Sequence, residues 1–83
     1  MVDKFQLQEY RREIDKLDYE IIALLEVRFS LTDRIGEIKK NTDMQVEDIQ
    51  REMEIYDKIK DNNIRKVYDR ILEVSKQSQN SLN

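Results

Sequence analysis

One apolar heptad pattern runs through about two fifths of the chain and limits what it can fold into. Apolar side chains recur at alternating steps of three and four residues from Leu7 to Ile38, and Arg28 is the charged exception. The seam consists of Leu7, Tyr10, Ile14, Leu17, Ile21, Leu24, Arg28, Leu31, Ile35 and Ile38. Such spacing is typical of a helix that pairs with another helix along one face. It predicts one long helix from about Phe5 to about Lys40.

The rest of the chain predicts two shorter helices. The 83 residues include no proline and one glycine, the residues that most often interrupt helices. Asp48 is a suitable N-cap for a helix whose apolar period covers 49–59. Turn residues follow at 61–63, and a third period runs over 64–82. We therefore expect an all-α fold with three helices, one long and two shorter, in a single domain spanning 1–83.

The long helix is too long for the rest of its own chain to cover. Its 36 residues would span roughly 54 Å, whereas a compact chain of this size is only about 30 Å across. A second copy of the chain is the simplest source of a covering helix. The sequence therefore predicts an intertwined homodimer in which the two long helices pair.

Composition excludes several kinds of chemistry. The chain has no cysteine and no histidine, so disulfides, zinc–thiolate sites and Ser–His catalysis are excluded. Eighteen acidic against fifteen basic residues give a net charge of −3, which is the wrong sign for a general nucleic-acid binder. No apolar run reaches the ~20 residues that cross a bilayer, and the N-terminus lacks a secretory h-region. We expect a cytoplasmic protein with no metal, cofactor, nucleic-acid or membrane partner.

Three basic residues of the long helix have two interpretations each. Arg28 either sets the register of the helix pair or faces a cavity and meets an anion, because a buried unpaired guanidinium is costly. Lys39 lies almost three turns later, roughly 16 Å along the axis, and either helps to hold a ligand or is a solvated lysine favoured by the helix dipole. Arg11 lies roughly 25 Å before Arg28, so it is either a surface residue or a contribution to the partner's site.

The two shorter helices add polar groups with helical spacing. Asp48 and Glu52 are four residues apart and share a face that Arg51 adjoins, although capping and dipole effects explain acids in a first turn equally well. Ser75 and Gln79, also four apart, continue the inward stripe of the third helix, or else belong to a fraying end.

Together these residues would form a cationic pocket in an acidic protein. The pocket would lack a good nucleophile and any group that titrates near neutral pH. Such a set suits a small dianion, held in one conformation and stabilised electrostatically as charge develops. Gly36, which is unfavourable inside a helix, indicates close approach of another backbone or of a ligand.

The order and spacing of these residues resemble the all-helical class of chorismate mutases, small intertwined dimers of the shikimate pathway. The resemblance covers roughly residues 7–80. Its motifs are Arg11–Asp18 followed by Ile21, Leu24, Leu25 and Arg28, then Gly36–Lys39, then Val46–Glu52, and finally Ser75 with Gln79.

The resemblance implies an isomerase of aromatic amino acid biosynthesis that converts chorismate to prephenate by a [3,3] Claisen rearrangement without cofactor or metal. It implies that Arg11, from the other subunit, and Arg28 bind the two carboxylates of the substrate. Lys39 and Gln79 would donate hydrogen bonds to the ether oxygen, which gains negative charge as its C–O bond breaks.

The resemblance also assigns the remaining polar residues. Glu52 would accept a hydrogen bond from the ring hydroxyl, and Asp48 would contribute nearby, partly through its backbone. Arg51 and Ser75 would assist binding and orientation. A free-standing mutase is expected, and another enzyme of the aromatic pathway could bind it.

Two other functions stay open from the sequence. An isochorismate–pyruvate lyase shares this fold and uses a similar cationic pocket for a pericyclic elimination. A non-enzymatic helical dimerisation module is the alternative of a different class. It predicts that alanine at Arg28, Lys39 and Gln79 affects nothing beyond stability.

Overall fold

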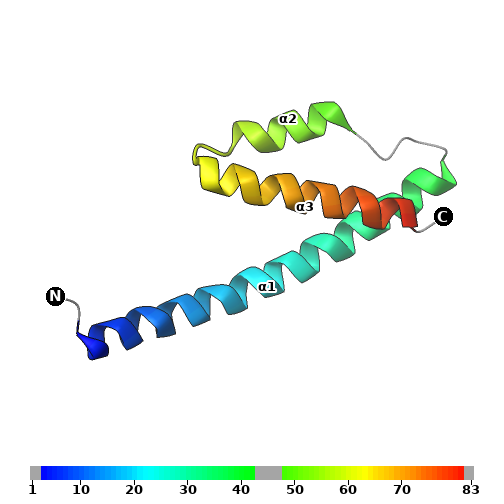
Figure 1. The fold of residues 1–83 in the computed structure, drawn as a ribbon. Coiled ribbons are helices and arrows are strands. Elements are labelled where there is room, and N and C mark those ends of the chain that lie inside the picture. The colour runs from blue at the N-terminus through cyan, green and yellow to red at the C-terminus, as the bar shows by residue number, and fades with distance from the viewer. Residues whose placement is uncertain (1–2, 43–47, 82–83) are drawn as a thin grey trace.

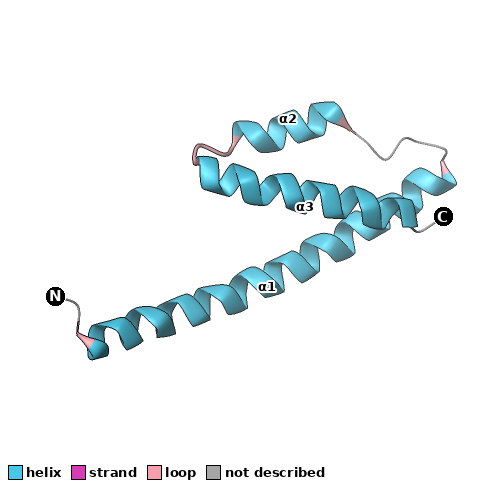
Figure 2. Ribbon diagram, in the orientation of Figure 1, coloured by secondary structure: helices cyan, strands magenta, loops and turns pink. Residues whose placement is uncertain are grey.

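The computed structural model describes residues 3–42 and 48–81, and three α-helices account for most of them. The helices are α1 (Lys4–Asn41), α2 (Ile49–Asp57) and α3 (Asn62–Ser81). Figure 2 shows helices and short loops in the described part of the chain, with no strand. The predicted all-α fold with one long and two shorter helices is confirmed. Part of one predicted motif, Val46–Glu47, lies outside the described residues.

The predicted bounds of α1 agree with the structure to within one residue at each end. Asp3 caps its start, since its Oδ1 accepts a hydrogen bond from the backbone N–H of Gln6 at 2.8 Å. Thr42 ends it, and its backbone N–H donates to the carbonyl of Ile38 at 2.9 Å. Within the described ranges, no helix is apolar enough over a sufficient length to cross a membrane.

The predicted start of the third helix was wrong by two residues. The sequence places a turn at 61–63 and begins the helix at Ile64, but Asp61 instead acts as a cap. Its Oδ1 accepts hydrogen bonds from the backbone N–H groups of Asn63 at 2.7 Å and of Ile64 at 3.1 Å. Because these first-turn donors are satisfied, α3 begins at Asn62. The second helix ends at residue 57, two residues earlier than its apolar period suggests.

The three helices are stacked so that α3 lies between α1 and α2 in Figure 1. The last part of α3 crosses the C-terminal half of α1, and α2 runs beside α3 on the side away from α1. The apolar core at this crossing is small: Ile71 and Leu72 are buried, together with the polar Ser75 and Gln79. A core that includes two polar residues suggests that this crossing does more than stabilise the fold.

Gly36 is the buried residue of α1 at the crossing. A Cβ atom built on it would lie 2.9 Å from Cγ and 3.0 Å from Cα of Gln79. These distances are too short for ordinary van der Waals contact, so any side chain at this position would push the two helices apart. The sequence predicts close approach of another backbone or of a ligand at this glycine, and the structure shows the backbone of α3 there.

The N-terminal half of α1 extends away from the other helices (Figure 1). Every residue from 4 to 24 is exposed, including the seam residues Ile14, Leu17 and Ile21, whose surfaces are 51–55% accessible. The chain measures 58 × 23 × 15 Å, and its radius of gyration of 17.2 Å exceeds the roughly 12 Å of a compact chain of this length. The apolar seam is therefore open to solvent along this half, and the seam residues Leu31, Ile35 and Ile38 of the other half are also 45–59% accessible.

Contacts at separate points join α2 to α3. The hydroxyl of Tyr56 donates to Oδ1 of Asp69 at 2.5 Å, and the guanidinium of Arg65 lies 4.6 Å from the centre of the Tyr56 ring. The Asp69 carboxylate, which accepts the phenolic proton, raises the pKa of Tyr56, and partial burial adds to this effect. One turn earlier on α2, Glu52 pairs with Lys76 at 3.0 Å. These contacts fix the helix that carries the acidic side of the pocket described next.

Candidate active site

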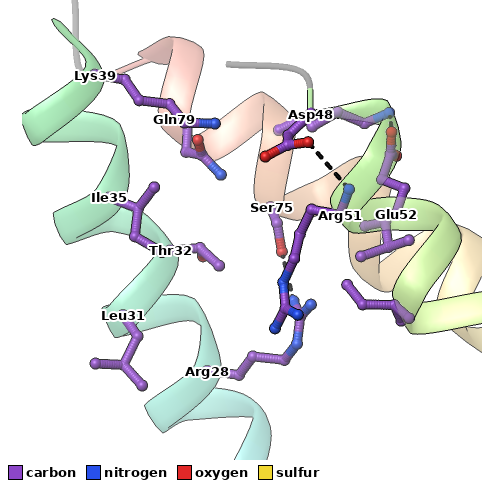
Figure 3. A pocket seen from close by; sticks show the side chains of 13 residues that line it. Arg28, Leu31, Thr32, Ile35, Lys39, Asp48, Arg51, Glu52, Ser75 and Gln79 are labelled. Atoms are coloured by element: carbon purple, nitrogen blue, oxygen red, sulfur yellow. Dashed lines mark hydrogen bonds and ion pairs between the residues drawn. The ribbon is translucent and has the colours of Figure 1, made fainter. Parts of the chain in front are cut away.

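A pocket of about 440 Å³ opens between the three helices (Figure 3). It is lined by Arg28, Leu31, Thr32, Ile35 and Lys39 of α1, by Asp48, Arg51, Glu52 and Ile55 of the α2 segment, and by Leu72, Ser75, Lys76 and Gln79 of α3. Seven of the eight residues singled out in the sequence therefore line one pocket. The eighth, Arg11, lies on the exposed N-terminal half of α1, away from the pocket of its own chain.

The lining of α1 follows from helical geometry. Arg28, Thr32, Ile35 and Lys39 are separated by steps of four, three and four residues, which place them on one face of a helix. Figure 3 shows them in order along that face, with Arg28 and Lys39 toward opposite ends of the pocket. Steps of three and four residues thus set the two cations apart, with the apolar side chains of Leu31 and Ile35 between them.

Arg28 is half-buried and is held from α3. Its Nη1 donates a hydrogen bond to Oγ of Ser75 at 3.0 Å, and its guanidinium lies 5.9 Å from the centre of the Tyr68 ring. Within residues 3–42 and 48–81, no carboxylate lies within ion-pair distance of this guanidinium. A half-buried cation without a counter-ion is unfavourable, so the geometry favours an anionic ligand beside Arg28.

The start of α2 brings acids and a further cation to the opposite wall. Asp48 does cap the helix, because its Oδ1 accepts from the backbone N–H of Arg51 at 3.0 Å, and it also lines the pocket. The side chain of Arg51 forms a 3.2 Å ion pair with the exposed Glu54. Figure 3 shows its guanidinium extending toward the region of Arg28. Capping and pocket lining are therefore compatible for Asp48.

The α3 wall contributes buried neutral hydrogen-bonding groups. Ser75 and Gln79 are only 4% and 8% accessible, so they do not belong to a fraying end. The hydroxyl of Ser75 donates to the carbonyl of Ile71 at 2.9 Å while it accepts from Arg28. Within the described part of the chain, the buried Oε1 of Gln79 has no hydrogen-bond partner. A buried polar atom left unpaired costs about 1–3 kcal/mol, which a bound molecule could offset.

Sequence reasoning missed Lys76, which lines the pocket. Its Nζ lies 3.0 Å from Oε1 of Glu52, across the gap between α3 and α2. A signal was available, because Lys76 is four residues after the buried Leu72 and three before Gln79, and so shares their helix face. It was missed because a lysine interrupts the inward-facing stripe of the third helix, and the heptad seam of the long helix gives no information about that helix.

The charges of the pocket oppose the charge of the whole chain. Four cations, Arg28, Lys39, Arg51 and Lys76, against two carboxylates, Asp48 and Glu52, give the lining a formal charge of +2, in a chain of charge −3. Within the described ranges, no group of three or more potential ligand side chains could hold a metal ion. The arrangement suits a small dianion that is bound by fixed charges and hydrogen-bond donors.

The fold and the pocket define a small all-α protein with a positively charged pocket at a helix crossing. Comparison with known proteins identifies its family. Residues 10–80 match the family described as chorismate mutase type II. The chain belongs to this family, since the match covers most of its length.

Two curated relatives carry related descriptions. A bifunctional chorismate mutase/prephenate dehydratase of Aquifex aeolicus is 46% identical over 54 residues, which are 65% of this chain and 15% of that protein. A chorismate mutase of Methanocaldococcus jannaschii is 38% identical over 60 residues, 72% of this chain and 59% of that protein. The matched region thus spans less than two thirds of either relative.

A solved structure has the same fold. It is a conserved hypothetical protein from Pyrococcus furiosus, with a TM-score of 0.85 and 39% sequence identity. The alignment covers 93% of this chain and 99% of that chain. The long helix and the two shorter helices therefore recur together in a related protein over nearly its whole length.

Proposed function

We propose that this protein is a chorismate mutase that converts chorismate to prephenate by a [3,3] rearrangement. The observation that carries the proposal is the half-buried Arg28, which has no ion-pair partner among the described residues and lies in a pocket of charge +2. Chorismate carries two carboxylates, so its charge complements that of the pocket. Membership of the chorismate mutase type II family supports the same assignment.

The α1 and α3 walls would stabilise the transition state. Arg28 binds one carboxylate through the guanidinium N–H groups that do not donate to Ser75. Lys39 and Gln79 donate to the ether oxygen, where negative charge grows as the C–O bond breaks. Donors placed in advance stabilise this charge without reorganising during the reaction. The apolar floor between them holds the enolpyruvyl arm in the reactive chair-like conformation, which lowers the entropic part of the barrier.

The α2 wall would orient the ring. Glu52 accepts a hydrogen bond from the ring hydroxyl, and Asp48 contributes beside it, partly through its backbone. Arg51 and Ser75 assist in binding and orientation. This division uses the acids for the one substrate group that can donate and keeps the cations for the groups that carry or gain negative charge.

The site would be completed by a second copy of the chain. The exposed seam over residues 4–24 provides an apolar face for pairing with another α1. In an antiparallel pair, Arg11 of one subunit would reach the other subunit's pocket and bind the second carboxylate. Light scattering of the purified protein should give the mass of a dimer. A monomer at micromolar concentration would contradict this part of the proposal.

We also propose a cytoplasmic location, and a complex with another aromatic-pathway enzyme is compatible with this site.

The direct test is to follow the loss of chorismate absorbance after adding purified protein and to identify the product. Prephenate is the expected product. Conversion of isochorismate with release of pyruvate, in the absence of prephenate, would instead support the lyase of the same fold. Failure to convert either compound would favour a non-enzymatic helical module.

A further inference from the structure

The ion pair between Glu52 and Lys76 differs from the other ion pairs whose geometry the structure gives. Arg12–Glu9, Arg51–Glu54 and Arg70–Glu73 each join residues three apart on one helix, with side chains 48–68% accessible. Glu52 and Lys76 join two helices, and their side chains are 22% and 35% accessible. Exposed pairs within a helix contribute little. The sheltered pair between helices lies inside the pocket and holds a group in a defined place.

The atoms used in this pair leave Glu52 available to a ligand. Lys76 contacts Oε1 of the carboxylate at 3.0 Å. Among the described residues, the hydrogen bond that the structure gives to this carboxylate goes to Oε1. An ionised carboxylate can accept hydrogen bonds at both oxygens, so the second oxygen can receive a donor from a bound molecule while the first stays fixed.

The position of Lys76 also separates opposite charges within the pocket. Arg28 and Lys39 line the α1 side, and Arg51 is adjacent to Glu52 on α2. A carboxylate that moved freely in this space would be drawn to these cations and would compete with an anionic substrate for them. Pairing with Lys76 keeps the Glu52 carboxylate against α3 and leaves the cations of α1 to the substrate.

We propose that Lys76 is a positioning residue of the active site, which fixes the carboxylate of Glu52 so that it accepts the ring hydroxyl of the substrate and does not neutralise the anion-binding cations. The inference rests on the proposed mutase function. Lys76 acts through Glu52 and is not assigned a contact with the substrate. Its effect therefore requires the carboxylate at residue 52.

The test compares steady-state kinetics with chorismate for Lys76→Met, Lys76→Arg, Glu52→Gln and the double variant Glu52→Gln/Lys76→Met. Methionine preserves much of the unbranched apolar stem and removes the charge. We expect Lys76→Met to lower kcat/KM by roughly 10- to 100-fold, as for other losses of alignment, and Lys76→Arg to retain activity within a few-fold. Lys66→Met, on the exposed side of α3, should leave kcat/KM unchanged.

The double variant distinguishes positioning from direct binding. If Lys76 acts through Glu52, then adding Lys76→Met to Glu52→Gln should change kcat/KM by less than about threefold, because coupled residues are non-additive. An equal loss in both backgrounds, or wild-type kinetics for Lys76→Met, would overturn the inference while the mutase function stands. A wild-type protein inactive on chorismate would overturn both. Thermal unfolding and the dimer mass verify that each variant is folded. If Lys76→Met does not fold, Lys76→Gln takes its place in the comparison.

Discussion

The two halves of α1 share one heptad pattern but have different surroundings. From residue 4 to residue 24 the whole surface is exposed, seam included. From residue 25 onward, half-buried positions appear at regular intervals, Gly36 is buried, and Arg28 and Lys39 line the pocket. The same pattern thus runs beside a pocket in one half, where Leu31, Ile35 and Ile38 are still 45–59% accessible, and is exposed at every position in the other half.

Helix length explains the difference. The 38 residues of α1 span roughly 57 Å, whereas the 20 residues of α3 span only about 30 Å. The chain can therefore cover about half of its longest helix. We expect the uncovered half to serve a second copy, so that one half of α1 builds the subunit's own site and the other half completes the partner's site.

The largest effects are expected in the half that lines the pocket. Arg28→Ala and Lys39→Ala should each lower kcat/KM by at least ~10²-fold. The first removes the cation that holds a substrate carboxylate in place, and the second removes a preorganised donor to the ether oxygen. Arg34→Ala, an exposed change on the same helix, should have no comparable effect. Steady-state kinetics with chorismate measure the fall in kcat/KM, and circular dichroism and the dimer mass verify that each variant is folded. Full activity in both variants would exclude this pocket as the active site.

Gln79→Glu should inactivate the protein at neutral pH and restore activity as the pH falls. A carboxylate with an ordinary pKa near 4.3 is ionised at pH 7, so it cannot donate to the ether oxygen and repels its charge. The protonated acid, which forms at low pH, can donate again. We expect roughly a 10²-fold loss at pH 7, as for the loss of one such donor. Gln77→Glu on the exposed side of α3 is the control, and a pH profile like that of the wild type would remove Gln79 from this role.

A mixing experiment connects the two halves of α1. Arg11→Ala should be inactive alone, yet an exchanged equimolar mixture with Arg28→Ala should recover about a quarter of wild-type activity. Half of the dimers are then mixed, and each mixed dimer has both defects in one site and an intact second site. Activity is measured after subunit exchange. No recovery, when exchange is shown to be complete, would mean that Arg11 does not act in the partner's site.

The smallest effect is expected at the helix crossing. In Gly36→Ala the helix gains about 1 kcal/mol of intrinsic propensity, whereas overpacking against Gln79 costs about 1–3 kcal/mol. The free energy of unfolding should therefore fall by about 0–2 kcal/mol, and kcat should fall several-fold because Gln79 is displaced. Glu37→Ala, at the neighbouring exposed position, isolates the steric effect. Denaturant unfolding measures the free energy of unfolding, and kinetics with chorismate measure kcat. Higher stability with unchanged kcat would contradict the close contact between Gly36 and Gln79.

Much of the fold was predictable because local rules decide it. The seam and the lack of proline predicted α1 to within one residue at each end, and Asp48 was predicted as a cap that the structure contains. The start of α3 was misplaced because Asp61 and two asparagines suit both a turn and a helix cap, and sequence alone does not choose between them. Lys76 was missed because its partner Glu52 lies 24 residues away in the chain, and the sequence alone does not bring the two together.

The sequence by itself determined the helical class, the length of the first helix, the place of Arg28 as the charged residue of its apolar seam, and the need for close approach at Gly36. These are consequences of helical period, capping and side-chain entropy, which act between near neighbours. Only the tertiary structure decided that α3 crosses the second half of α1, that seven polar candidates line one pocket and that Lys76 pairs with Glu52. These results depend on distances between separate helices, which are set by packing at one glycine and one small core.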